Sequence, residues 1–207
     1  MTTELELANK APSSFSIVKL LKCKYQELES YIQLTAGPAT GVLYITENSP
    51  QFLSGHVRLR GRDEGRYPYK YLEMIDYLFG PEANTIEVCS RSVKGCITVD
   101  INPDTSPDIV DDAQQLNFIA DNSFNRWRAD PPYNEDTALS MYNTKLPNTA
   151  KLLAAGARVC KPNSLMFLLL GPQNYQYCPK GIKRIGWICC TIVPNNELRA
   201  LHIFYKY

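Results

Sequence analysis

The sequence predicts an α/β fold with a mostly parallel sheet and an antiparallel C-terminal hairpin. Three observations support this prediction. From residue 67 onward, apolar segments of strand length alternate with segments of helical periodicity. Residues 164–170, SLMFLLL, form a continuous apolar run that is typical of a strand buried on both faces. Residues 184–193 and 199–207 flank a Pro-Asn-Asn-Glu turn and predict a hairpin.

Composition narrows the classes of protein to which the chain can belong. Its 207 residues suit one domain with a small appendage, and the net charge of +1 gives no overall attraction to polyanions. Any contact with nucleic acid therefore needs a local basic patch. The apolar runs are too short for a membrane span, and the polar N-terminus does not resemble a targeting sequence. Seven irregularly spaced cysteines without a C-x-x-C pair indicate reduced thiols, no metal site and a cytoplasmic location.

The chain divides into a small N-terminal extension, residues 1–65, and a main domain, residues 66–207. The extension is expected to hold a helix over residues 17–34 and strands over 42–46 and 52–60. In the main domain the sequence predicts strands over residues 85–90 and 96–101, a strand ending before Asp130, and helices over 69–80 and 136–160, the latter interrupted by Pro147. The segment after the first of these strands is shortened, because a crossover helix needs about a dozen residues.

Asp130-Pro131-Pro132-Tyr133 is the segment that most clearly suggests chemistry. It follows a predicted strand, and ligands of open α/β sheets bind beyond the carboxyl ends of strands. Two prolines fix the backbone there and leave only carbonyl acceptors. A carboxylate and a carbonyl can accept both N–H bonds of an aromatic amine, while Tyr133 stacks on its ring. The alternative is a plain turn after a strand.

These four residues resemble motif IV of the S-adenosylmethionine-dependent amino-methyltransferases, which modify adenine N6, cytosine N4 or guanine N2. The resemblance covers about residues 66–207. It implies a Rossmann-like class I methyltransferase fold, S-adenosylmethionine as cofactor and a nucleic-acid substrate. It also implies that Asp130, Pro131, Pro132 and Tyr133 form the catalytic segment that receives the target base.

Further segments resemble cofactor-binding motifs of the same family. Asp100 closes a strand where it can bind the ribose hydroxyls or merely cap the next turn, and Asp112-Ala113 resembles the segment that binds the cofactor's adenine amine. Lys70 lies in a segment similar to motif X and can pair with the methionine carboxylate or be a surface lysine.

The first motif departs from the family pattern. Residues 87–91, Glu-Val-Cys-Ser-Arg, stand where the family has a glycine-rich turn. This segment, followed by Asn102, is similar to the mRNA adenosine methyltransferases and their bacterial relatives. The resemblance adds Glu87, Cys89, Arg91 and Asn102 to the predicted cofactor site, although the missing glycines put that site in doubt.

The densest basic cluster lies outside these motifs, in the extension. It comprises His56, Arg58, Arg60 and Arg62, with Arg66 nearby. The cluster can contact phosphates, or it can be a solvated strand face balanced by the acidic residues 63 and 64.

The sequence therefore predicts an enzyme that transfers a methyl group from S-adenosylmethionine to adenine N6, in DNA rather than RNA. One alternative is a guanine N2 or cytosine N4 methyltransferase. Another is a non-catalytic methyltransferase-like subunit that works with a protein partner, which the missing glycines favour. A third is an unrelated α/β binding protein.

Overall fold

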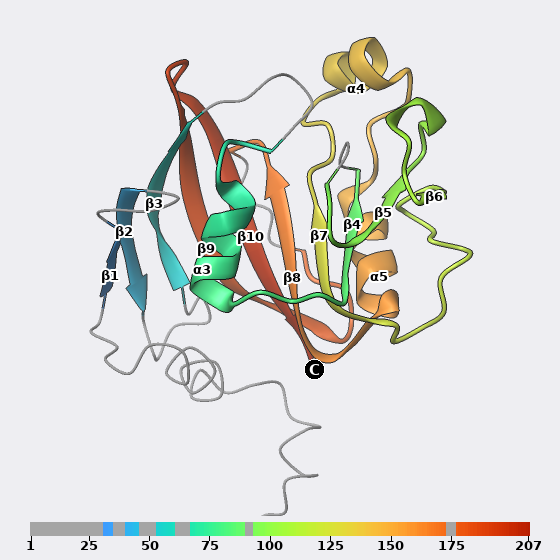
Figure 1. Cartoon of the computed structure of the whole chain (residues 1–207), viewed down its shortest axis with the longest axis horizontal. Helices are drawn as coiled ribbons and strands as arrows, with labels where there is room; N and C mark the ends of the chain where they lie inside the picture. Colours follow the sequence, from blue (N-terminus) through green and yellow to red (C-terminus); the bar gives the residue numbers. More distant parts are fainter. Residues whose placement is uncertain (1–30, 35–39, 46–52, 61–66, 90–92, 173–176) are drawn as a thin grey trace, which may run out of the picture.

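The computed structural model describes residues 31–34, 40–45, 53–60, 67–89, 93–172 and 177–207. These residues form one ten-stranded sheet with the order β1-β2-β3-β9-β10-β8-β7-β4-β5-β6 (Figure 1). Strands β6, β5, β4, β7 and β8 run parallel, and β10 runs antiparallel between β8 and β9. The predicted parallel sheet with an antiparallel C-terminal hairpin is confirmed.

The elements follow one another along the chain with these bounds. They are β1 (Tyr31–Leu34), β2 (Thr40–Ile45), β3 (Leu53–Arg60), α3 (Tyr71–Phe79), β4 (Thr85–Val88), β5 (Ile97–Asp100), the 3-10 turn η1 (Pro103–Thr105), β6 (Ile109–Val110), β7 (Phe124–Ala129), α4 (Glu135–Tyr142), α5 (Thr149–Val159), β8 (Cys160–Leu170), β9 (Ile182–Val193) and β10 (Glu197–Lys206). None of the described helices is long and apolar enough to cross a membrane.

The N-terminal segment differs from its prediction. Most of the helix expected over residues 17–34 falls on residues 1–30, outside the described part of the chain. Its last four residues form strand β1, so the helix prediction is wrong there. Tyr31 and Leu34 pair with Tyr44 and Gly41 of β2, and this ladder of backbone hydrogen bonds overrides the local helical periodicity.

Strand β3 connects this region to the rest of the sheet. It pairs antiparallel with β2 and parallel with β9, with Leu53 opposite Gly186 and Arg60 opposite Val193. The described strands of the predicted extension therefore continue the main sheet. The division of the chain at residue 65 stays a prediction.

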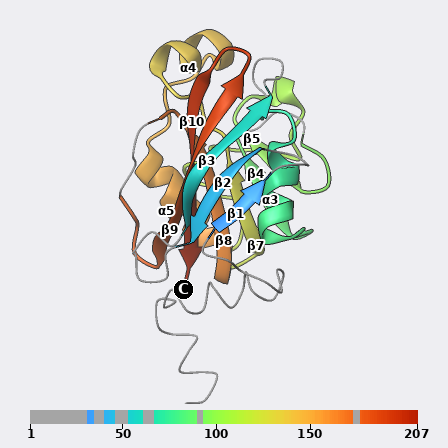
Figure 2. The same ribbon diagram turned by 90° about the vertical axis from the view of Figure 1, so that its left-hand side faces the viewer.

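Two helices cover opposite faces of the sheet. In Figure 1, α3 lies on the near face over β9 and β10, and Figure 2 shows α3 and α5 on opposite sides of the strands. Met74 and Ile75 of α3 are fully buried in a core with β3, β8, β9 and β10. Leu152 and Leu153 of α5 are fully buried in a second core with β4, β5, β7 and β8. The predicted double burial of the SLMFLLL strand follows, because β8 contributes to both cores.

The connection after β4 is short, as predicted. Strand β4 ends at Val88 and β5 begins at Ile97, and the described residues 93–96 contain no helix. The parallel strands therefore bring their following loops directly to one edge of the sheet. That edge is where a ligand site is expected in an open α/β fold.

Gly156 tests how tightly α5 packs on the sheet. A Cβ added to Gly156 would meet Trp127 at 2.8 Å and the methyl group of Met166 at 2.9 Å. We expect Gly156→Ala to lower the free energy of unfolding by about 1–3 kcal/mol, despite the better helix propensity of alanine. Trp127→Phe removes the indole atoms nearest the added methyl group. Chemical denaturation of both single variants and the double variant should therefore show a smaller penalty for Gly156→Ala when Trp127→Phe is also present. Equal penalties with and without Trp127→Phe would contradict this packing.

Candidate functional site

Four side chains that can bind a ligand or take part in a reaction follow four neighbouring strands, at the same edge of the sheet. Cys89 comes directly after β4, Asp100 ends β5, Asp112 lies just beyond β6, and Asp130 comes directly after β7. The chain proceeds from β4 outward to β5 and β6 and then returns to β7 on the other side of β4. The strand order therefore reverses between β4 and β7, which is the usual location of a ligand crevice.

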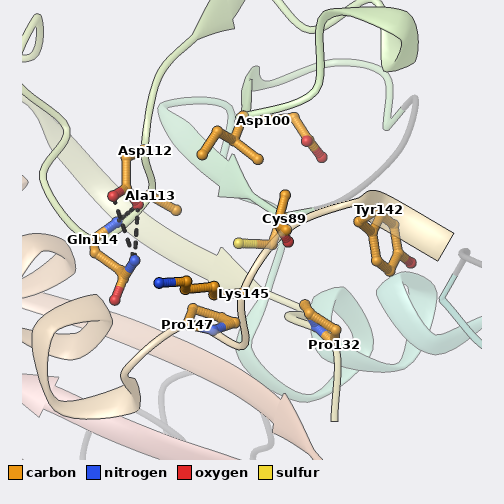
Figure 3. A pocket seen from close by; sticks show the side chains of 11 residues that line it. Cys89, Asp100, Asp112, Ala113, Gln114, Pro132, Tyr142, Lys145 and Pro147 are labelled. Atoms are coloured by element: carbon orange, nitrogen blue, oxygen red, sulfur yellow. Dashed lines mark hydrogen bonds between the residues drawn. The ribbon is translucent and has the colours of Figure 1, made fainter. Parts of the chain in front are cut away.

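An open pocket lies at this edge (Figure 3). It encloses about 510 Å³ of space, with its open mouth included. The lining comes from the loops after β4, β5 and β6, from the segment after β7, and from α4 and the segment that follows it. The lining residues are Cys89, Asp100, Ile101, Asp112, Ala113, Gln114, Pro132, Tyr142, Thr144, Lys145 and Pro147. Five residues predicted from the sequence thus meet in one pocket: Cys89, Asp100, Asp112, Ala113 and Pro132.

The two carboxylates of the pocket are held by their own loops. Asp100 as a residue is only 5% exposed. Its Oδ1 accepts a hydrogen bond from the backbone N–H of Asn102 at 2.9 Å. Oδ1 of Asp112 accepts hydrogen bonds from the backbone N–H of Gln114 at 2.9 Å and from its side-chain amide at 3.2 Å. These contacts fix the orientation of both acids. A carboxylate has about four acceptor positions, so hydrogen-bonded carboxylates of this kind can still bind ligand donors.

Cys89 occupies the turn where the resembling family has glycine. Its φ is +57°, which costs a residue with a Cβ about 1–2 kcal/mol. The backbone N–H of Cys89 donates to the carbonyl of Val99 at 3.0 Å and so ties the turn to β5. Burial raises the pKa of the Cys89 thiol, and the neighbouring carboxylates of Asp100 and Asp130 raise it further. The side chain is therefore a neutral lining group rather than a nucleophile.

The pocket's chemistry fits the nucleoside part of S-adenosylmethionine. Asp100 and Asp112 offer acceptors from two different loops, as a ribose diol and an adenine amine require. Ala113 and Pro147 supply apolar contact for a flat ring. Lys145 is the one cationic residue among the described residues of the lining and is exposed, so it can pair with an anionic group of a ligand.

A second group of side chains lies beside the pocket and is centred on Asp130. The Tyr133 hydroxyl donates a hydrogen bond to Oδ1 of Asp130, and Nη1 of Arg199 donates to the same hydroxyl. The Arg199 guanidinium also lies over the Tyr133 ring, 4.2 Å from its centroid, and 3.8 Å from Oδ1 of Asp130. Glu197 holds Arg199 from the other side, through Nε, at 2.9 Å.

Burial dominates the electrostatics of this group. The Asp130 side chain is 11% exposed, and desolvation raises its pKa to about 7, although the Arg199 charge and the Tyr133 hydrogen bond act in the opposite direction. Such a pKa lies close to physiological pH, which is typical of residues that exchange protons or accept hydrogen bonds from a substrate.

Four other predicted residues are not part of the described pocket lining, namely Lys70, Glu87, Asn102 and Pro131. Glu87 is fully buried in β4, where it accepts a hydrogen bond from the Tyr67 hydroxyl and forms an ion pair with Arg128 at 2.7 Å. Lys70 is the N-cap residue of α3, and its Nζ lies 3.8 Å from the Glu73 carboxylate.

Three further predicted residues are Asn102 and Arg91, which follow β5 and β4, and Pro131 of the Asp130–Tyr133 segment. Asn102 caps η1 by accepting from the backbone N–H of Asp104 at 2.9 Å. Pro131 is buried between Asp130 and the lining residue Pro132. Arg91 lies outside the described residues.

Sequence reasoning missed Lys145, Gln114 and Arg199. Lys145 follows α4, and nothing in its local sequence points to a ligand. Arg199 shows a weak signal, since it is a charged residue within the largely apolar strand β10. Its distance of 66 residues from Tyr133 hides their contact in the sequence.

The titration of Asp130 makes a prediction about stability. In the folded protein its pKa is about 7, whereas an unfolded aspartate has a pKa of about 3.9. Between these values the folded state holds a proton that the unfolded state has lost, so ionisation makes Asp130 progressively destabilising as the pH rises from about 4 to about 7. Asp130→Asn removes this titration. Thermal unfolding of both proteins across that range should show wild-type stability falling relative to the Asn variant as the pH rises. A constant difference would contradict the raised pKa.

Comparisons with known proteins add information about the fold. No family model and no curated protein matches the sequence. Among solved structures, the chain resembles TrmN from Thermus thermophilus with 11% identity and a TM-score of 0.50, over 70% of this chain and 50% of TrmN. It also resembles PH0851 with 10% identity and a TM-score of 0.41, over 97% of this chain and 61% of that one. The chain therefore spans about half the length of TrmN. The predicted Rossmann-like α/β fold with a mostly parallel sheet is confirmed, and these likenesses show the fold alone.

Proposed function

We propose that this chain is an S-adenosylmethionine-dependent methyltransferase that acts on an exocyclic amine of a nucleic-acid base, with adenine N6 in DNA as the leading target. One observation carries the proposal. The segment Asp130-Pro131-Pro132-Tyr133 directly follows strand β7 and lies beside a pocket that already contains Asp100 and Asp112. The acceptor for an amine and the acceptors for a nucleoside thus lie at one edge of the sheet.

The pocket would hold the cofactor. Asp100 would accept from the ribose hydroxyls and Asp112 from the adenine amine, while Ala113 and Pro147 contact the ring. The bound cofactor supplies an electrophilic sulfonium methyl group. The chain's own contribution is to orient the cofactor and to exclude water from it.

Asp130 and Tyr133 would receive the target base. The Asp130 carboxylate can accept an N–H bond of the amine, which localises the nitrogen lone pair that the aromatic ring otherwise delocalises. Pro132 already lines the pocket, so an amine that binds its backbone segment lies next to the cofactor site. A base in a duplex must leave the stack to reach this position.

Without a base, the Tyr133 hydroxyl donates to Oδ1 of Asp130 and takes one acceptor position of that carboxylate. The amine would use another acceptor position of Asp130 or replace the Tyr133 hydroxyl. Arg199 covers one face of the Tyr133 ring, so a stacked base would use the other face or displace the guanidinium. Arg199 also supplies a positive charge near Asp130, which favours the carboxylate form that accepts the amine.

A non-catalytic methyltransferase-like subunit is the second candidate. The closed contact among Asp130, Tyr133 and Arg199 favours it, because a purely structural group would have this arrangement. Cys89 in the place of glycine points the same way. Such a subunit would act with a catalytic protein partner.

Cofactor binding is the first test of the proposal. We expect calorimetric titration with S-adenosylmethionine and S-adenosylhomocysteine to show binding to the wild type. Asp112→Ala should weaken it at least about tenfold, because a buried hydrogen bond to the ligand is lost. Asp104→Ala is the matched control, since Asp104 is exposed on η1 and lies outside the lining. Asp112→Asn keeps an acceptor for the hydrogen bonds of Gln114. Comparing its unfolding curve with those of the wild type and Asp112→Ala shows whether weaker cofactor binding comes from a disturbed loop or from a lost contact to the ligand. Absence of binding to the wild type would refute the stand-alone enzyme.

Methyl transfer at varied pH is the second test. The rate on DNA or RNA with labelled cofactor should rise as the pH increases through about 7, because Asp130 must be ionised to accept the amine. The Tyr133 hydroxyl lowers the pKa of Asp130 by donating to it. Tyr133→Phe keeps a stacking ring but removes that donor, so its pH profile should shift to higher pH while Tyr133→Ala loses activity.

Nucleoside analysis of the product identifies adenine N6, cytosine N4 or guanine N2 and the polymer. Cofactor binding without transfer to any nucleic acid would favour the non-catalytic subunit. A pH profile that is identical in the wild type and Tyr133→Phe would contradict the role given to Asp130.

A further inference from the structure

The basic cluster of the N-terminal region lies on one face of strand β3. Along this strand Val57 and Leu59 point into the core, whereas His56, Arg58 and Arg60 are exposed. Because side chains alternate along a strand, the three basic residues share the opposite face. Nε2 of His56 lies 2.7 Å from Oγ1 of Thr191, which shows that this face continues onto β9.

This face carries positive charge, and the described strands around it contain almost no acids. No aspartate or glutamate occurs in the described strands β1, β2, β3, β8 and β9. The single acid of β10, Glu197, pairs in register with Ile192, which belongs to the core under α3, and its carboxylate binds Arg199. The alternative of a strand face balanced by the acidic residues 63 and 64 is not tested, because these residues lie outside the described part of the chain.

An aromatic side chain stands beside the basic residues. Tyr44 of β2 is 55% exposed and pairs in register with Ser54, which shares a face with His56. Partners in register lie on the same side of a sheet, so Tyr44 flanks the row of basic residues.

No described helix covers this face over β3. Helix α3 packs on the opposite face, as Figures 1 and 2 show. The core under α5 includes no residue of β3 and only Ile182 of β9. The surface of Tyr44, His56, Arg58 and Arg60, here called the β3 face, is thus open among the described elements.

The direction of β3 relates this face to the candidate site. Strand β3 runs parallel to β9, and β9 and β8 both run antiparallel to β10, so β3 ends at the same edge as β7 and β8. The row from His56 to Arg60 therefore leads toward the sheet edge where Asp130 and Tyr133 lie.

We propose that the β3 face binds a single-stranded segment of nucleic acid, with phosphates on Arg58 and Arg60 and an unpaired base stacked on Tyr44. This inference rests on the proposed function, for which it names the substrate-binding surface. A basic, acid-free strand row beside an exposed aromatic ring suits an unpaired strand, since phosphate contacts and base stacking together hold single strands on open sheets. The chain's small net charge makes such a local row necessary for nucleic-acid binding.

Fluorescence anisotropy with a labelled single-stranded oligonucleotide tests the proposal. Arg58→Glu/Arg60→Glu should weaken binding by at least about tenfold, and it should flatten the salt dependence because two phosphate contacts are lost. The control is Lys151→Glu/Lys180→Glu, which changes the net charge equally at two exposed residues away from the β3 face. Tyr44→Ala should weaken binding about tenfold with an unchanged salt slope. Thermal unfolding and titration with S-adenosylmethionine should be alike in all of these proteins.

Three results would contradict the proposal that the β3 face binds single-stranded nucleic acid. They are equal binding by the arginine and lysine variants, tighter binding of a duplex of the same sequence, and no binding of any oligonucleotide by the wild type. The last result, combined with cofactor binding, would also refute the nucleic-acid substrate. The protein could also bind the oligonucleotide through the arginines but bind no cofactor. That result would support nucleic-acid binding by the β3 face and refute the proposed methyltransferase function.

Discussion

The buried ion pair between Glu87 and Arg128 holds together the part of the sheet on which the candidate site depends. The two residues are register partners on β4 and β7, where the strand order reverses, and the Tyr67 hydroxyl also binds Glu87. Removing one partner of such a pair leaves an uncompensated buried charge and typically costs about 3–5 kcal/mol. The pair therefore fixes the positions of Cys89 and Asp130, which come directly after these two strands. This gives Glu87 a structural task in the described state, apart from its predicted role toward a cofactor.

The site combines two kinds of carboxylate. Asp100 and Asp112 are anchored by backbone N–H groups of their own loops, which orient both carboxylates. Asp130 is instead desolvated, and only Tyr133 and Arg199 offset the burial. The first pair suits the binding of neutral hydroxyl and amine donors. Asp130 suits a reacting amine, because its protonation changes near neutral pH.

The sheet has a shortened connection near the pocket and additional strands at its other end. Between β4 and β5 there is no crossover helix in the described residues, and the turn uses Cys89 at positive φ. Beyond β9 the sheet gains β3, β2 and β1. These added strands extend the sheet away from the pocket. The basic residues of β3 form a row that leads toward the sheet edge on which the candidate site lies. In the proposed function, the small pocket region would bind the cofactor and the added strands would contact a long substrate.

Local sequence predicted most strands and helices in the described part of residues 67–207, since apolar periodicity matches the face that each segment buries, but it did not predict β6 or η1. It also located Asp100, Asp112 and Asp130, because acids that follow strands gather at one edge of a parallel sheet. The sequence could not reveal that residues 31–34 form a strand, since their partner β2 decides this. Nor could it place Lys145 in the pocket or Arg199 over Tyr133, because these contacts join distant segments. The tertiary structure alone decided that Glu87 faces Arg128 and that no described helix covers the face of His56, Arg58 and Arg60. The physical reason is that charge burial and pairing depend on neighbours brought together by folding, whereas periodicity depends only on neighbours along the chain.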